Sequence, residues 1–199
     1  MTKNPITRRD VLKTLALGAA GGSVLQSIPL QAARRVHQMI AQERSHSAAR
    51  TYRPKFFSAH QYRTLSSLCD AIIPADEHSA RAVKAGAPEF IDLLTSENKD
   101  YQVSLGGRLM WLDGLCADRF GNTYLACSPA QKKQVLDLIA YRKNADKDAA
   151  LSQGVEFFAF LRRLTSDGFY SSEIGIKDLQ YIGNTYLREF PGCPAVPEG

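Results

Sequence analysis

Apolar residues recur every three or four positions from Phe56 onward, which is the period of an amphipathic α-helix. The first stripe follows a capping box, Ser58 with Gln61, and ends before Pro74, which cannot continue a helix. That stripe consists of Tyr62, Leu65, Leu68, Cys69 and Ile72. No run alternates apolar and polar residues over the length of a strand. The pattern therefore predicts helices and no sheet.

Four further helices are indicated along the chain. One follows Pro88, which suits a first helical turn because proline has no N–H to leave unpaired. The next runs over about residues 101–120 and ends at Gly121, and another opens at the Ser128/Gln131 capping box. A last long helix carries the apolar residues Phe157, Phe158, Phe160, Leu161 and Leu164. Residues 168–186 are less regular, although Lys177 to Tyr181 suits a short helix. We therefore predict one all-α domain of five or six helices over residues 56–199.

Charge is distributed unevenly along the chain. Residues 1–55 hold ten basic and two acidic side chains, a net charge of +8, whereas residues 56–199 carry −3. We predict that residues 34–55 form a basic, mostly exposed linker. It lacks the interleaved aromatic residues that bind single-stranded nucleic acid, so no nucleic-acid partner is expected.

Residues 1–33 form a targeting segment. The order from Thr7 is a threonine, two arginines, any residue, a hydrophobic residue, leucine and lysine, followed by an Ala- and Gly-rich apolar stretch. This segment resembles a twin-arginine export signal, whose pattern is carried by Arg8, Arg9, Leu12 and Lys13. The stretch is too interrupted by glycine to span a membrane. Export to the periplasm by the twin-arginine translocase is expected. Residues 27–33 offer no clean pair of small residues for cleavage, so a cut near Ala33 and retention as an anchor both stay open.

Chemistry-bearing motifs are sparse. There is no glycine-rich phosphate loop, and the four cysteines are too far apart in sequence for a metal cluster. We expect no cofactor and no metal in this chain. Asp76, Glu77 and His78 have the elements of an acid/base site, which a polar surface loop explains equally well. A free-standing periplasmic enzyme and a structural protein without a redox partner are therefore the alternative hypotheses.

Cys193 lies near the C-terminus in a segment without core-forming periodicity. Three states stay open for it: a disulfide to Cys127, a disulfide to another chain, or a free thiol. Cys69 and Cys116 fall on inward helical faces and are expected to be buried thiols.

Two segments, taken in their order along the chain, say more about the family of this protein than its composition does. Residues Leu68–Asp76 and Ala85–Asp92, followed by the Phe157-Phe158 pair and the late Gly192-Cys193-Pro194, resemble the gluconate 2-dehydrogenase subunit 3 family. The resemblance covers about residues 54–197. This family is the small, or gamma, subunit of membrane-associated, flavin-dependent sugar dehydrogenases.

The resemblance implies a non-catalytic small subunit that acts as chaperone and export carrier for a large subunit containing FAD. A multihaem cytochrome c subunit is a further implied partner, and the complex supplies the membrane association. It also implies a docking surface, and a disulfide from Cys193 to the large subunit is consistent with it. Candidate docking residues are Pro74, Asp76, Phe169, Tyr170, Tyr181 and Tyr186; burial of the tyrosines in the chain's own core is the alternative. The substrate, whether gluconate, glucose, another aldose or a glycoside, is left open.

Overall fold

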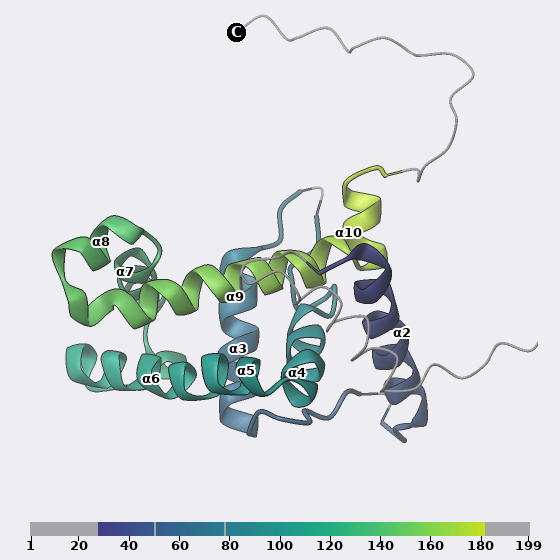
Figure 1. Ribbon diagram of the computed structural model, residues 1–199, viewed down its shortest axis with the longest axis horizontal. Helices are drawn as coiled ribbons and strands as arrows, with labels where there is room; N and C mark the ends of the chain where they lie inside the picture. Colours follow the sequence, from purple (N-terminus) through teal and green to yellow (C-terminus); the bar gives the residue numbers. More distant parts are fainter. Residues whose placement is uncertain (1–27, 50, 78, 182–199) are drawn as a thin grey trace, which may run out of the picture.

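The computed structural model describes residues 28–49, 51–77 and 79–181, and every regular element within these ranges is a helix (Figure 1). The prediction of an all-α fold is confirmed. The α-helices are α2 (Leu30–His46), α3 (Ala59–Ile72), α4 (Ala87–Glu97), α5 (Lys99–Tyr101), α6 (Gly107–Phe120), α7 (Pro129–Ile139), α8 (Arg142–Lys147), α9 (Ser152–Tyr170) and α10 (Glu173–Asp178). A π-helical turn, η1 (Gln102–Gly106), joins α5 to α6, and two 3₁₀ turns are η2 (Tyr124–Ala126) and η3 (Ala149–Leu151).

Local sequence signals set the helix ends. Both predicted capping boxes are present, with the Ser58 and Ser128 hydroxyls each accepting the backbone N–H three residues later. Gly121 closes α6 in the left-handed conformation, at φ 71°. The short C-terminal helix begins at Glu173 rather than Lys177, because the Ser172 hydroxyl caps it by accepting the N–H of Gly175 at 3.0 Å.

Helix α4 lies at the centre of the core. Its residues from Ala87 to Thr95 are all buried, since α2, α3 and α9 pack around it. Helix α9 is the longest of the described helices and runs across the molecule from α7 and α8 at one end to α2 and α10 at the other (Figure 1). Gly168 permits the close crossing of α9 over α4, because a Cβ there would lie 3.0 Å from the Phe90 ring.

The prediction of an exposed linker over residues 34–55 is wrong for residues 34–46. Those residues belong to α2, which buries Ala32, Ala33, Val36 and Ile40 against the core. The spacing of these four residues is helical, and the arginines between them extend from the other face. Arg44 of α2 pairs with Glu89 of α4 at 2.5 Å, and the His37 ring stacks on Phe90 at 5.2 Å. Only the segment that follows α2 connects it to α3.

Candidate functional site

Four carboxylates lie in the segments that carry the family resemblance, and Asp92 is the most enclosed of them. Its side chain is fully buried in α4. One oxygen accepts the Tyr52 hydroxyl at 2.8 Å and the Lys55 N–H at 2.7 Å. The other accepts the N–H groups of Phe56 and Phe57, at 3.2 and 3.0 Å. With both oxygens occupied by these donors, Asp92 holds residues 52–57 against α4.

Asp70 and Glu89 likewise hold neighbouring segments of the fold together. Asp70, on α3, accepts the Val83 N–H at 3.0 Å and so fixes the loop that leads into α4. Glu89 receives Arg44 and ties α2 to α4. Asp70, Glu89 and Asp92 are therefore explained by the assembly of the fold.

The loop after Pro74 is open to solvent. Asp76 closes it on itself: its backbone N–H donates to the Ser79 carbonyl, and its carboxylate accepts the Ser79 N–H at 2.6 Å. A hollow of about 570 Å³ lies over this loop. Pro74, Asp76 and Glu77 are exposed, which makes Pro74 and Asp76 accessible for docking, and His78 lies outside the described residues. The alternative acid/base site gains no support, because the carboxylates of Asp76 and Glu77 are exposed to solvent and no cleft of buried polar groups among the described residues surrounds them.

The C-terminal aromatic residues divide between core and surface. Phe169 is 0% exposed, so a partner could not reach it without opening α9, and its prediction as a docking residue is wrong. Tyr170 is 41% exposed and Tyr181 is 43% exposed, with Leu179 between them at 58%. These two tyrosines remain candidate docking residues, and Tyr186 lies outside the described residues.

The described cysteines are enclosed. Cys69, Cys116 and Cys127 are free and buried. Burial raises the pKa of the Cys69 thiol to about 12, and burial together with the hydrogen-bonded thiol of Cys127 raises the pKa of Cys116 to about 12. These thiols are therefore poor nucleophiles at neutral pH. Cys193 lies outside the described residues, so its disulfide stays a prediction, as does the export signal at Arg8, Arg9, Leu12 and Lys13.

The described histidines make structural contacts. The His37 Nε2 atom lies 3.0 Å from the Ser171 hydroxyl, and burial lowers its pKa. The His60 Nε2 atom lies 2.7 Å from the Asp113 carboxylate, which also accepts the Tyr124 N–H. Within the described ranges no group of three metal-ligating side chains comes together. None of the described helices is long and apolar enough to cross a membrane.

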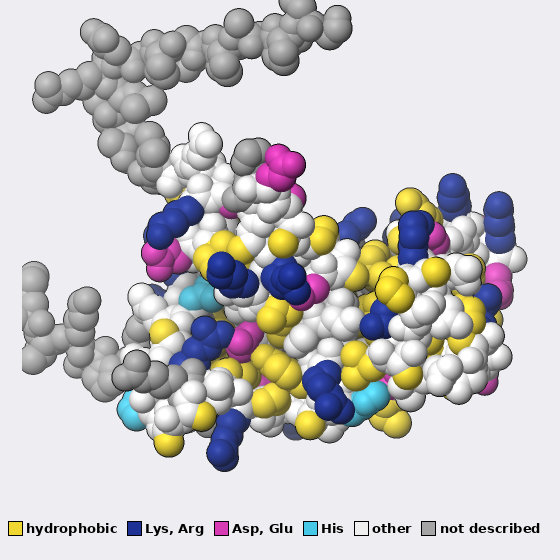
Figure 2. Space-filling model, turned by 180° about the vertical axis from the view of Figure 1, so that it is seen from behind, with side chains coloured by type: hydrophobic (Ala, Val, Ile, Leu, Met, Phe, Trp, Pro, Cys, Tyr) yellow, Lys and Arg dark blue, Asp and Glu magenta, His cyan; other side chains and the backbone are white. Residues whose placement is uncertain are grey.

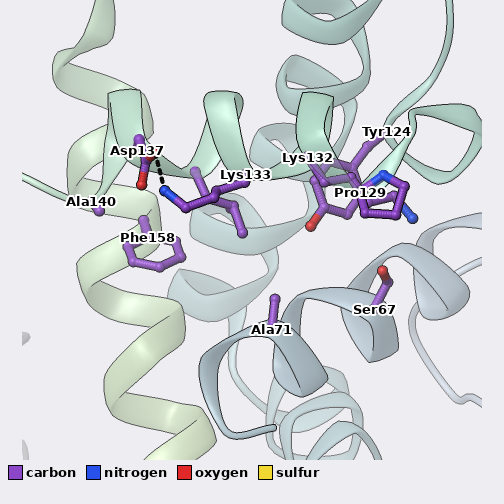
Figure 3. Close-up of a pocket in the computed structure, with 10 residues that line it drawn as sticks. Ser67, Ala71, Tyr124, Pro129, Lys132, Lys133, Asp137, Ala140 and Phe158 are labelled. Atoms are coloured by element: carbon purple, nitrogen blue, oxygen red, sulfur yellow. Dashed lines mark hydrogen bonds and ion pairs between the residues drawn. The ribbon is translucent and has the colours of Figure 1, made fainter.

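A hollow between α3, α7 and α9 was also not predicted from the sequence (Figure 3). We call it the α7 hollow; it has a volume of about 470 Å³. It is lined by Ser67, Ala71, Tyr124, Pro129, Lys132, Lys133, Leu136, Asp137, Ala140 and Phe158. The adjacent lysines four and five residues after the Ser128 cap are the signal in the sequence that points to it, since both fall in the first two turns of α7.

Comparison with known proteins identifies the family. The family described as gluconate 2-dehydrogenase subunit 3 matches residues 59–192, a range that includes α3 to α10 and the carboxylates Asp70, Glu89 and Asp92. A search of curated proteins and a search of solved structures each returned no match. The chain therefore belongs to the gluconate 2-dehydrogenase subunit 3 family and is a small subunit of that type of dehydrogenase complex.

Proposed function

We propose that this chain is the non-catalytic small subunit of an exported, flavin-dependent sugar or sugar-acid dehydrogenase. It acts as chaperone and twin-arginine export carrier for the FAD-containing large subunit. The observation that carries the proposal is the pairing of the family match over residues 59–192 with the Thr7–Lys13 pattern ahead of it. The mature complex works on the periplasmic side of the cytoplasmic membrane, where a cytochrome c subunit with haem accepts its electrons.

The join between signal and domain suits a carrier. The backbone N–H of Ile28 donates to the Asp167 carboxylate of α9 at 3.5 Å, and α2 begins two residues later and packs on α4. Fewer than twenty residues separate Lys13 from this packed helix. The twin-arginine translocase transports folded proteins. A signal that is joined to the folded domain by a short segment would therefore bring both the domain and a partner docked on it to the translocase.

The docking surface that we propose has two parts. Tyr170 and Tyr181, with the exposed Leu179 between them, offer apolar area of the kind that anchors protein interfaces. Pro74 and Asp76 belong to an exposed loop, beneath the hollow of about 570 Å³ described above. The flavin, and with it the recognition of the sugar, belongs to the large subunit.

The carrier role is tested by changing both signal arginines, Arg8→Lys with Arg9→Lys, in cells that also produce the large subunit. We expect both proteins to stay in the cytoplasm. The chain offers a matched control, Arg34→Lys with Arg35→Lys, which changes two adjacent arginines of α2 and should leave export intact. Flavoprotein that still reaches the periplasm when the signal pair is changed would contradict the carrier role.

A covalent link through Cys193 is the second part of the proposal. Its thiol and a thiol of the large subunit would lose two electrons and two protons to a periplasmic disulfide, leaving an intersubunit disulfide and a reduced dithiol. Electrophoresis of the exported complex without reductant should show one band of combined mass. Reductant or Cys193→Ser should separate that band into two, and two bands from the unreduced wild type would rule the link out.

A further inference from the structure

The α7 hollow has an apolar floor and a polar rim. Ala71 of α3, Leu136 of α7 and Phe158 of α9 supply carbon atoms to its walls. Lys132 and Lys133 extend toward opposite ends of the hollow, and the Lys133 ammonium is bonded to Asp137 at 2.6 Å (Figure 3). A site of this composition suits a group with an apolar body and a polar end.

A buried hydroxyl without a partner points into this hollow. Tyr124 is 0% exposed, and its hydroxyl has no hydrogen-bond partner among the described residues (Figure 3). The nearby Ser67 hydroxyl restrains the rise that burial causes in the tyrosine pKa, but it makes no hydrogen bond of good geometry. The phenol therefore keeps its proton and is a donor. Leaving such a group unpaired costs about 1–3 kcal/mol, which an incoming acceptor would recover.

The charge around the hollow defines the acceptor further. The Lys132 ammonium lies 5.3 Å over the Tyr124 ring, and no carboxylate of the described residues forms an ion pair with it. Helices α7 and α8 together carry five basic and two acidic side chains, a net charge of +3, although residues 56–199 as a whole carry −3. Figure 2 shows Lys and Arg side chains at that end of the molecule, as over the rest of the visible face. A second copy docked through the same face would bring like charges together, so complementarity favours an acidic partner surface.

The geometry points to the α7 hollow as a docking pocket for the large subunit. It would receive an apolar side chain on its floor, and a neighbouring carboxylate would accept from the Tyr124 hydroxyl and pair with Lys132. This inference rests on the proposed function, because it takes the large subunit as the partner, and it adds a third contact to the two proposed above. The pocket faces are provided by α3, α7 and α9, so docking there would also brace these three helices.

The charge is tested with the full-length, tagged chain co-produced with its flavin-containing large subunit. Lys132→Glu should reduce the recovered flavoprotein about tenfold or more, as expected for loss of a desolvated charge contact. Lys143→Glu is the matched control, because it makes the same change on α8, where the ammonium lies over the exposed Tyr141 ring and does not line the hollow. Equal effects of the two substitutions would reduce the contact to general charge attraction and overturn the pocket.

The hydroxyl gives a test with opposite signs. Tyr124→Phe removes an unpaired buried group, so the isolated chain should melt at a higher temperature while recovery of the flavoprotein falls several-fold. A lower melting temperature would mean that the hydroxyl is already bonded within the chain, which would overturn its role as a donor. Ala71→Trp, at an exposed position that lines the hollow, should fill the hollow and reduce recovery about tenfold without unfolding the chain.

Recovery of flavoprotein with the wild-type chain distinguishes failure of the carrier role from failure of the docking pocket. If the wild-type chain captures no flavoprotein, the proposed function itself is contradicted. If it captures flavoprotein and the hollow variants capture it equally well, only the docking pocket is overturned and the carrier role stands.

Discussion

Asparagine in place of Asp92 is expected to loosen the join between residues 52–57 and α4. The carboxylate accepts four donors, two at each oxygen. Asparagine has one acceptor oxygen, and its amide N–H₂ would face two donors. The Tyr52 hydroxyl can rotate and accept a hydrogen bond from the amide. The least damaging orientation therefore puts the amide nitrogen in the place of Oδ2, the oxygen that accepts from Tyr52 and Lys55. The Lys55 N–H then loses its acceptor.

The magnitude follows from the hydrogen bonds involved. A hydrogen bond to a charged group contributes about 1.5–3 kcal/mol, against about 1 kcal/mol for a neutral one. One such bond is lost and those of Phe56 and Phe57 are weakened, so the free energy of unfolding should fall by about 3 kcal/mol. Domains of this size are typically stable by about 5–15 kcal/mol, so the change is large and measurable.

Urea unfolding followed by circular dichroism at a helical wavelength measures the effect. Asp118→Asn is the matched control, because Asp118 is exposed on α6 and its substitution should change stability by no more than about 0.5 kcal/mol. Hydrogen exchange should also accelerate at the amides of Lys55, Phe56 and Phe57. If Asp92→Asn costs no more than the control, the buried carboxylate does not hold these elements together and our reading of the motif is wrong.

Three further predictions follow from burial and packing. Gly154→Ala should lower the free energy of unfolding by about 1–3 kcal/mol, because the new Cβ would lie 2.3 Å from the Trp111 ring. Gly114→Ala is the matched control: a Cβ there would have no neighbouring atom within 4 Å, so the free energy of unfolding should rise by about 0.5–1 kcal/mol. Thermal unfolding measures both changes. Burial lowers the His37 pKa below 6.5, so the unfolded chain takes up a proton that the folded chain resists, and stability should fall as pH drops below 6.5. His37→Gln should make stability less dependent on pH in this range. An unchanged pH slope in this variant would contradict the role of the buried imidazole. Intact mass of the exported chain should show any cleavage at or before Ile28, because a protease needs extended substrate; an end inside α2 would contradict the packing of that helix.

Helix ends were predictable because their signals are local. The Ser58 and Ser128 caps, Pro88 and Gly121 act within one turn, so the sequence around each defines its role. Helix α2 was not predicted because its buried stripe contains two alanines, which give little hydrophobic contrast among many arginines. Composition pointed to a linker, and the spacing of the four buried residues pointed to the helix.

The site depended on contacts that sequence spacing does not reveal. Asp92 lies in a motif recognised from sequence, but its donors are 35 to 40 positions away. Phe169 and Tyr170 are adjacent and looked equivalent, yet α9 continues through both and turns one inward and the other outward. The Tyr124 hydroxyl meets the α7 hollow only because η2 packs against α3.

The central claim is that this chain carries a flavoprotein out of the cytoplasm as its subunit. Purification from the periplasm through a tag on this chain tests it most directly, with flavin absorbance and dehydrogenase activity measured on the eluate and on each separated subunit. We predict a flavin-containing large subunit in the eluate and no activity from this chain by itself. Recovery of the chain alone, or dehydrogenase activity from the isolated chain, would contradict the account.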